Sequence, residues 1–404
     1  MKKIIFCADG TWNSAEDKTG APPLDSKEDI GEVSLTGVTN VVKLFANLAG
    51  NVTPETLALH DEQEKVCADE AGNVTQVVKY MHGVGDSSNF LIKILGGTLG
   101  MGVIERIVRG YTFISRHYVP GDAIHLIGFS RGAYTARALA GMIAKVGLLN
   151  PATYDSSDKA EAYRLGMAAW AKSKSISLEG AGKLTDLATH MVNFVESFIA
   201  KQLPDNGLIP DVPIKSVAVW DTVGSMGIPE YVADKRYDVL RFIDTKLSSK
   251  VQYGFHAMAI DEMRRDFPVT KWDDRDGVEQ VWFIGAHADV GGGYPIAESR
   301  LSDMALSWMM DKLAAPNVGV EFASPLVYKP DTSLGQAAIH TPWNETPFSS
   351  FPTQPREVVD NDVLHISVSE RWASGAPTYR PVAMKRFAEA GVDNCKIDKT
   401  CYSF

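Results

Sequence analysis

The sequence predicts an α/β fold, with a mostly parallel sheet flanked by helices and a helical, lid-like insertion. Three observations lead to this prediction. Short apolar runs of strand length recur along the chain, at residues 3–8, 77–81, 123–127, 216–220 and 280–284. Segments with helical spacing lie between them, including residues 38–49, 103–118 and 133–144. Polar residues directly follow several of the runs, as expected where the carboxyl ends of parallel strands carry a site.

The strand expected at 123–127 leads into the pentapeptide Gly128–Gly132, which has Ser130 at its centre. A strand, a sharp glycine-flanked turn and a helix together form the setting of a nucleophile elbow. The two glycines have a steric reason, because strand and helix approach too closely at this turn for a Cβ atom. The bare G-x-S-x-G pattern is weak by itself. A serine in an ordinary glycine turn is the alternative interpretation of this segment alone.

A serine nucleophile needs a base, and the base needs a carboxylate that fixes its tautomer. Two later strand ends supply these groups. The run at 216–220 ends at Asp221, and the run at 280–284 leads through Gly285-Ala286 to His287. Serine, acid and histidine then follow in the chain order of α/β-hydrolases. We therefore take Ser130 as nucleophile, His287 as general base and acid, and Asp221 as the orienting carboxylate.

Other assignments stay open for these residues. Asp221 is also a plausible cap of the next turn, and Asp289 competes with it for the orienting role. The glycine run after Asp289 fits an anion-binding nest. His256 precedes a segment, residues 257–267, with a helical pattern, which favours a supporting role beside the site. His125 lies within a strand and is expected to point into the core.

An oxyanion formed during acyl transfer needs hydrogen-bond donors. The backbone N–H of Arg131, directly after the nucleophile, is the first candidate. The first strand ends in Asp9-Gly10-Thr11, and the backbone of Gly10 or Thr11 is the second candidate. A plain Asp-Gly turn is the alternative. Asp9 is expected either to support the site or to hydrogen-bond across the strand ends.

We expect one hydrolase domain over residues 1–314 and a Pro-rich extension, residues 315–404, packed on the same domain with one strand near 363–368. Residues 150–213 form a helical insertion, with helices expected at 159–172 and 184–201, at a point where hydrolases commonly carry a lid. Residues 90–104 are apolar and glycine-rich. They either line an acyl pocket, touch a bilayer or form a buried loop.

Composition excludes several classes of function. The chain has 404 residues, 45% of them hydrophobic, which is enough for a sizeable core. A net charge of −10 without a basic run argues against a nucleic-acid partner. The four cysteines are scattered without metal-binding spacing, so no metal or cofactor is expected. The alternatives to a serine hydrolase are a non-catalytic binding protein on this fold and a metal-dependent hydrolase built from Asp9, Asp221, His256, Asp261, His287 and Asp289.

Targeting signals are not apparent in the sequence. Lys2-Lys3 is followed by too few apolar residues for a secretory signal, and no stretch reaches transmembrane length. We therefore expect a protein that is made and folded in the cytosol. If it acts elsewhere, a leaderless route must export it.

Further motifs accompany the candidate site residues in a fixed order. As a set they resemble the uncharacterised α/β-hydrolase domain family that includes the first class of type VI secretion lipase effectors, over about residues 1 to 300. These motifs are Asp9-Gly10-Thr11, Tyr80–Gly85, Gly121-Asp122, Gly128–Ala133 with Ala136-Arg137, Trp220–Gly224, His256–Glu262, and Trp282-Phe283 with His287–Tyr294.

The resemblance implies an α/β-hydrolase fold and the hydrolysis of esters, in the effectors those of phospholipid acyl chains, as in a phospholipase A. It matches Ser130 to the nucleophile of the family, and Asp221 and His287 to its other motif positions. Peripheral contact with a membrane, an immunity protein and a partner in the secretion apparatus are further implications of the same resemblance.

Overall fold

The computed structural model describes residues 1–10, 37–57, 59, 62–82, 99–181, 203–223, 246–333, 337–346, 348–374, 379–387 and 395–400. A ten-stranded sheet runs through these residues in the order β12-β11-β10-β9-β8-β5-β1-β4-β3-β2. Neighbouring strands from β12 to β4 are parallel, whereas β3 pairs antiparallel with both β4 and β2. The predicted α/β class with a mostly parallel sheet is therefore confirmed.

The strands of this sheet are β1 (Lys3–Ala8), β2 (Asn51–Val52), β3 (Glu62–Ala68), β4 (Val74–Met81), β5 (Ala123–Phe129), β8 (Ile214–Trp220), β9 (Val251–Ala259), β10 (Val278–Phe283), β11 (Val363–His365) and β12 (Lys396–Asp398). A separate pair is formed by β6 (Leu148–Leu149) and β7 (Leu208–Ile209). The α-helices are α1 (Asn40–Asn47), α2 (Pro54–Leu57), α4 (Leu99–His117), α5 (Arg131–Val146), α6 (Lys159–Ala181), α8 (His287–Gly291), α9 (Arg300–Ala314) and α10 (Ile366–Ser374).

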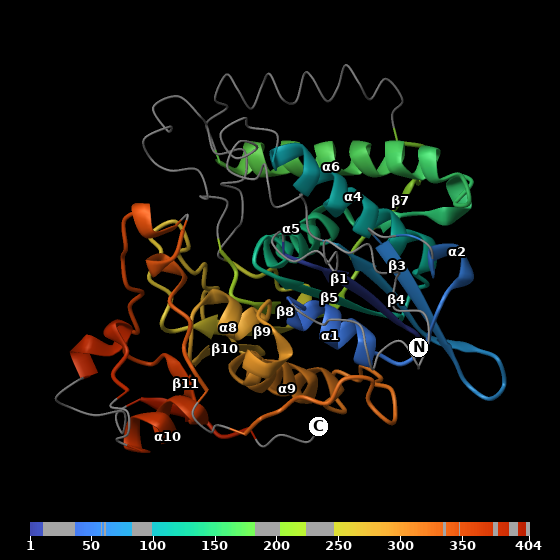
Figure 1. Ribbon diagram of the computed structural model, residues 1–404. Helices are drawn as coiled ribbons and strands as arrows, with labels where there is room; N and C mark the ends of the chain where they lie inside the picture. Colours follow the sequence, from blue (N-terminus) through green and yellow to red (C-terminus); the bar gives the residue numbers. More distant parts are fainter. Residues whose placement is uncertain are drawn as a thin grey trace.

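Helices cover both faces of the sheet, with α4, α5 and α6 on one face and α1 and α9 on the other (Figure 1). Because strand residues alternate between faces, Ile4 and Phe6 pack under the first group while Ile5 and Cys7 pack under the second. Strands buried on both faces must be apolar almost throughout, and every residue of β5 is buried.

The chain changes direction along the sheet at β1. From β1 it runs to β4 on one side, and it then returns to β5 on the other side of β1, where Ala8 lies opposite Gly128. The helix after β1 covers one face and the helix after β5 covers the other. In α/β sheets such a switch point leaves a crevice at the carboxyl ends of the strands, where ligands bind. Asp9 and Ser130 directly follow the two strands that meet here.

The segment after residue 251 corrects one prediction. Residues 251–259 form the buried strand β9, whereas the sequence indicated a helix beginning near His256. A strand buried on both faces has no clean alternation, and its apolar run resembles that of a buried helix segment. The charged residues that suggested a helical face, from Asp261 onwards, follow the end of the strand.

The described residues include parts of the helical insertion and of the C-terminal extension. Helix α6 packs on α4 and α5, and it contributes Leu165, Ala169 and Trp170 to the same core. In the extension the expected strand near 363–368 ends at His365, after which α10 begins, and β12 adds a second strand. Most of residues 90–104 and the helix expected at 184–201 lie outside the described residues.

Candidate active site

Ser130 connects β5 to α5 through a strained backbone conformation, with φ 56° and ψ −121°. A non-glycine residue rarely adopts a positive φ, and such strain collects at functional sites. The flanking glycines are sterically required, because a Cβ on Gly128 would lie 2.4 Å from the carbonyl oxygen of Gly132, and one on Gly132 would lie 2.0 Å from that of Ala8. The serine N–H is held by the carbonyl of Trp220 at 3.1 Å.

Asp221 directly follows β8 and also has a positive φ, 38°. Its carboxylate is fully buried, and one oxygen accepts the backbone N–H of Ala259 at 2.9 Å. The other oxygen lies 2.5 Å from Nδ1 of His287. Residues 66 positions apart in the chain are thereby joined, because β8 and β10 end at the same edge of the sheet.

His287 begins α8, and its ring lies against two aromatic side chains. Its centroid is 4.6 Å from that of Phe129, the residue before Ser130, and 5.2 Å from that of Phe267. Burial lowers the pKa of His287, while the carboxylate of Asp221 opposes this shift. The ring is therefore neutral near pH 7, with Nδ1 occupied by Asp221, which is the state that can accept a proton at Nε2.

Asp289, the competitor of Asp221, has a different histidine partner. Its Oδ1 lies 2.6 Å from Nδ1 of His340, and its Oδ2 accepts the backbone N–H groups of Ala286 and His340. His340 also contacts Glu298 at 2.9 Å. Burial opposes protonation of His340, but the two carboxylates outweigh it and raise its pKa to about 9. The geometry thus joins Asp221, and not Asp289, to His287.

Asp9 and Gly10 lie beside Ser130. A Cβ on Gly10 would lie 3.3 Å from the Cβ of Ser130. The N–H of Gly10 is donated to the carboxylate of Asp9 at 2.7 Å, and that buried carboxylate also accepts the hydroxyls of Tyr80 (2.8 Å) and Thr39 (2.9 Å). Burial raises the pKa of Asp9 despite these hydrogen bonds. An oxyanion could receive the N–H of Gly10 only if this bond to Asp9 were exchanged.

Arg131 and His256 are the remaining candidates that the structure describes. Arg131 begins α5, and the N–H groups of a first helical turn have no acceptor within their own helix. Thr11 lies outside the described residues. His256 is buried in β9, where its Nε2 accepts the N–H of Thr222 at 3.1 Å, and burial lowers its pKa to about 3. His256 therefore holds the loop that follows Asp221 and does not contact His287.

Arg356 is a site residue that the sequence did not indicate. From the C-terminal extension it reaches both carboxylate oxygens of Asp221, at 2.6 and 2.9 Å. Burial alone would raise the pKa of Asp221, but Arg356 and His287 outweigh it and hold the pKa well below its usual range. Glu262 was missed as well; it accepts the backbone N–H of His287 at 3.1 Å. Glu262 closes the motif His256–Glu262, which gave no sign of this contact, and Arg356 lies in no motif, so only the tertiary fold could reveal their roles.

Comparison with known proteins identifies the family. A family model described as the T6SS phospholipase effector Tle1-like catalytic domain matches residues 2–312. The chain belongs to this family. The match includes Ser130, Asp221 and His287, whereas Arg356 lies beyond it.

Three further proteins are similar to this Tle1-like chain. An uncharacterised protein of Saccharomyces cerevisiae is 27% identical over 270 residues, which are 66% of this chain and 32% of the yeast protein. The solved structure of the Tle1 effector bound to the VgrG spike of the type 6 secretion system is 17% identical, with a TM-score of 0.37, and the match covers 74% of this chain and 52% of that one. An uncharacterised protein from Pseudomonas aeruginosa is 13% identical, with a TM-score of 0.35, over 82% of this chain and 48% of that one. The chain therefore spans less than two thirds of each of these relatives.

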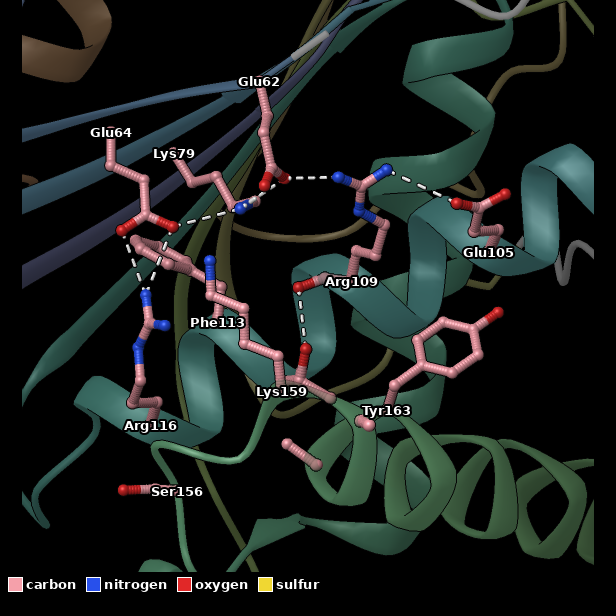
Figure 2. Close-up of a pocket in the computed structure, with 13 residues that line it drawn as sticks. Glu62, Glu64, Lys79, Glu105, Arg109, Phe113, Arg116, Ser156, Lys159 and Tyr163 are labelled. Atoms are coloured by element: carbon pink, nitrogen blue, oxygen red, sulfur yellow. Dashed lines mark hydrogen bonds and ion pairs between the residues drawn. The ribbon is translucent and has the colours of Figure 1, made fainter. Parts of the chain in front are cut away.

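The Tle1-like chain also has a charged pocket of about 450 Å³ between β3, β4, α4 and α6 (Figure 2). Most of its charges are paired: Lys79 pairs with Glu62 and Glu64, and Arg109 pairs with Glu62. None of the candidate site residues lines it. Among the described residues no three His, Cys, Asp or Glu side chains are grouped so that they could hold a metal ion. None of the described helices is long and apolar enough to cross a bilayer.

Proposed function

We propose that this Tle1-like chain is a serine hydrolase of carboxylic esters and that its substrates are the acyl esters of phospholipids. One observation carries the proposal: the buried His287–Asp221 pair, with Nδ1 and carboxylate 2.5 Å apart, meets a strained serine turn through the contact of Phe129 with His287. Membership in a family of phospholipase effectors supports the choice of substrate.

The proposed reaction follows from the tautomer of His287. Asp221 accepts a hydrogen bond from the Nδ1–H group of His287, so that Nε2 is free to take the proton of Ser130 as Oγ attacks the ester carbonyl carbon. The N–H of Arg131 stabilises the resulting oxyanion. His287 then protonates the departing alcohol, which leaves an acyl-serine. A water molecule attacks this ester while His287 removes its proton, and His287 then returns that proton to Oγ of Ser130 as the fatty acid is released.

Cellular context follows from the family alone. We propose that the chain contacts a membrane peripherally in order to reach its lipid, and that it is exported by a type VI route with the help of a partner from the secretion apparatus. An immunity protein that protects the producing cell belongs to the same proposal. The contacts of the described residues do not favour a metal-dependent hydrolase. Asp289 is hydrogen-bonded to His340, and His256 accepts the N–H of Thr222, so both already have partners within the protein.

The test is labelling of the purified protein with a fluorophosphonate probe in the presence of EDTA. We expect covalent labelling of the wild type and none of Ser130→Ala, since only an activated serine forms the phosphonyl ester. In parallel, fatty-acid release from phospholipid vesicles should fall by about 10⁶-fold in Ser130→Ala. Equal labelling of the two proteins, or vesicle hydrolysis that survives the substitution, would show that another group carries the activity.

A further inference from the structure

Arg356 is held in place by a segment of the extension that lies along the loop after β9. The N–H of Gln354 donates to the carbonyl of Met263 at 2.7 Å, and the N–H of Val358 donates to that of Ala383 at 3.0 Å. Between these anchors the side chain of Arg356 points inward, and the residue is 8% exposed. Besides Asp221 it reaches the carbonyls of Ala259 (2.6 Å) and Phe267 (2.8 Å).

These contacts fix the Asp221 carboxylate completely. Oδ1 accepts from Arg356 and from the N–H of Ala259, while Oδ2 accepts from Arg356 and lies against Nδ1 of His287. Arginine presents two parallel N–H groups, which match the two oxygens of a carboxylate in one orientation. Rotation of the carboxylate would break several hydrogen bonds at once. The direction of the acceptor offered to His287 is therefore set by Arg356.

The buried charge of Asp221 also indicates a role for Arg356. Asp221 has no exposed surface, and a buried carboxylate without a cation takes up a proton in place of remaining charged. A protonated Asp221 could not hold the His287 tautomer in which Nε2 is free. The other charges that act on His287 are Arg264, whose guanidinium is bonded to Glu262, and Glu262 itself. Arg356 is thus the cation that is bonded to Asp221.

We propose that Arg356 is a positioning residue of the active site, which acts on His287 through Asp221 and makes the C-terminal extension part of the catalytic machinery. This inference rests on the proposed function. The inference goes beyond that function by assigning a role to Arg356, which lies outside the family match that ends at residue 312.

The test is the rate of fluorophosphonate labelling of Ser130 between pH 5 and 9 in the intact chain, for the wild type, Arg356→Gln and Arg356→Lys. We expect Arg356→Gln to be labelled about 10²-fold more slowly at pH 7, because the acceptor for His287 is misplaced. The acid limb of its pH–rate profile should move to higher pH, since Asp221 without Arg356 takes up a proton more readily and then no longer holds the His287 tautomer that acts as a base. Arg356→Lys retains the positive charge but not the two parallel N–H groups. Its labelling rate should lie between those of the wild type and Arg356→Gln.

Arg380→Gln is the matched control. Arg380 lies in the same extension and donates to the carbonyls of Trp372 and Tyr379, with no carboxylate partner among the hydrogen bonds of the described residues. Its labelling rate should stay within about twofold of the wild type. A double-mutant cycle with Asp221→Asn completes the design. In the Asp221→Asn background, substitution of Arg356 should change the labelling rate little, because the carboxylate to which Arg356 binds is already absent.

The outcomes separate the two proposals. A wild type that is not labelled overturns the serine mechanism, and the role of Arg356 with it. A labelled wild type overturns only the role of Arg356 if Arg356→Gln reacts at the normal rate, if its rate falls equally at every pH, or if its effect multiplies fully with that of Asp221→Asn. If Arg356→Gln alone does not fold, Arg356→Lys provides the test, because a folded Lys variant with the labelling rate and pH profile of the wild type would overturn the role of Arg356.

Discussion

Asp221 and Asp289 illustrate how two buried acids of one site acquire different partners. Asp221 faces the Nδ1 atom of His287, whereas Asp289, only two residues after that histidine, faces His340. The strand-end position favoured Asp221, and proximity to His287 in the sequence made Asp289 its competitor. The fold decides between them because α8 turns the side chain of Asp289 towards its own N-terminus, where it accepts the N–H of Ala286.

This difference gives a prediction at the scale of single residues. Asp221→Asn should lower the turnover of an ester substrate by about 10⁴-fold, because an amide disfavours the His287 tautomer that can act as a base. Asp289→Asn, the matched control, should retain most of the activity, since its partner is His340. Steady-state kinetics on the two variants measure both effects. A larger loss in Asp289→Asn than in Asp221→Asn would reverse the assignment of the orienting acid.

At the scale of the element, the contact between β1 and the start of α5 depends on the absence of a side chain. Gly132→Ala would place a methyl group against the backbone carbonyl of Ala8, which cannot move without shifting the strand. We expect the free energy of unfolding to fall by about 3 kcal/mol or more. Alternatively, the protein folds with the serine turn displaced and is no longer labelled by the fluorophosphonate probe.

Gly141 provides the control within the same helix. A Cβ at Gly141 would meet nothing within 4 Å, so Gly141→Ala should stabilise the protein by about 0.5 to 1 kcal/mol, the difference in helix propensity. Chemical denaturation of the two variants compares them directly. Equal effects of the two substitutions would mean that helix propensity, and not the close approach to Ala8, governs this turn.

The same elements show how far the sequence leads. Ser130, Asp221 and His287 each follow an apolar run of strand length, so local patterns singled out all three as candidates, and the same patterns predicted the α/β class. The sequence could not identify β9 as a strand, because a strand buried on both faces lacks alternation. It could not identify Arg356 either, because the ion pair with Asp221 spans 135 residues and leaves no trace in the spacing of either segment.

At the scale of the whole molecule, the buried histidines predict that the folded state loses stability in acid. Burial lowers the pKa of His125 and His256 to about 3 and of His117 and His365 to about 4. Below pH 6.5, roughly the ordinary pKa of histidine, the unfolded chain binds a proton at each while the folded chain does not. The free energy of unfolding should therefore fall between pH 6.5 and 4, by about 1.4 kcal/mol per histidine per pH unit.

Denaturation at pH 7, 6 and 5 measures this slope, and His125→Asn should reduce it. His340 has the opposite sign. Its raised pKa, about 9, contributes stability that is complete below the ordinary pKa of histidine and is lost as the pH rises through 9. Stability that stays constant from pH 7 to pH 5 would contradict the assignment of these histidines as neutral in the folded state.

The position of Arg356 also has a consequence for the order in which the chain is made. A ribosome delivers Ser130, Asp221 and His287 long before it delivers residue 356, so the Asp221 carboxylate has no guanidinium partner until Arg356 has been made. A site whose charge balance depends on Arg356 is complete only after this part of the extension has been translated and has packed beside Asp221. For the lipid hydrolysis proposed above, this order delays the reaction until the extension has folded onto the sheet.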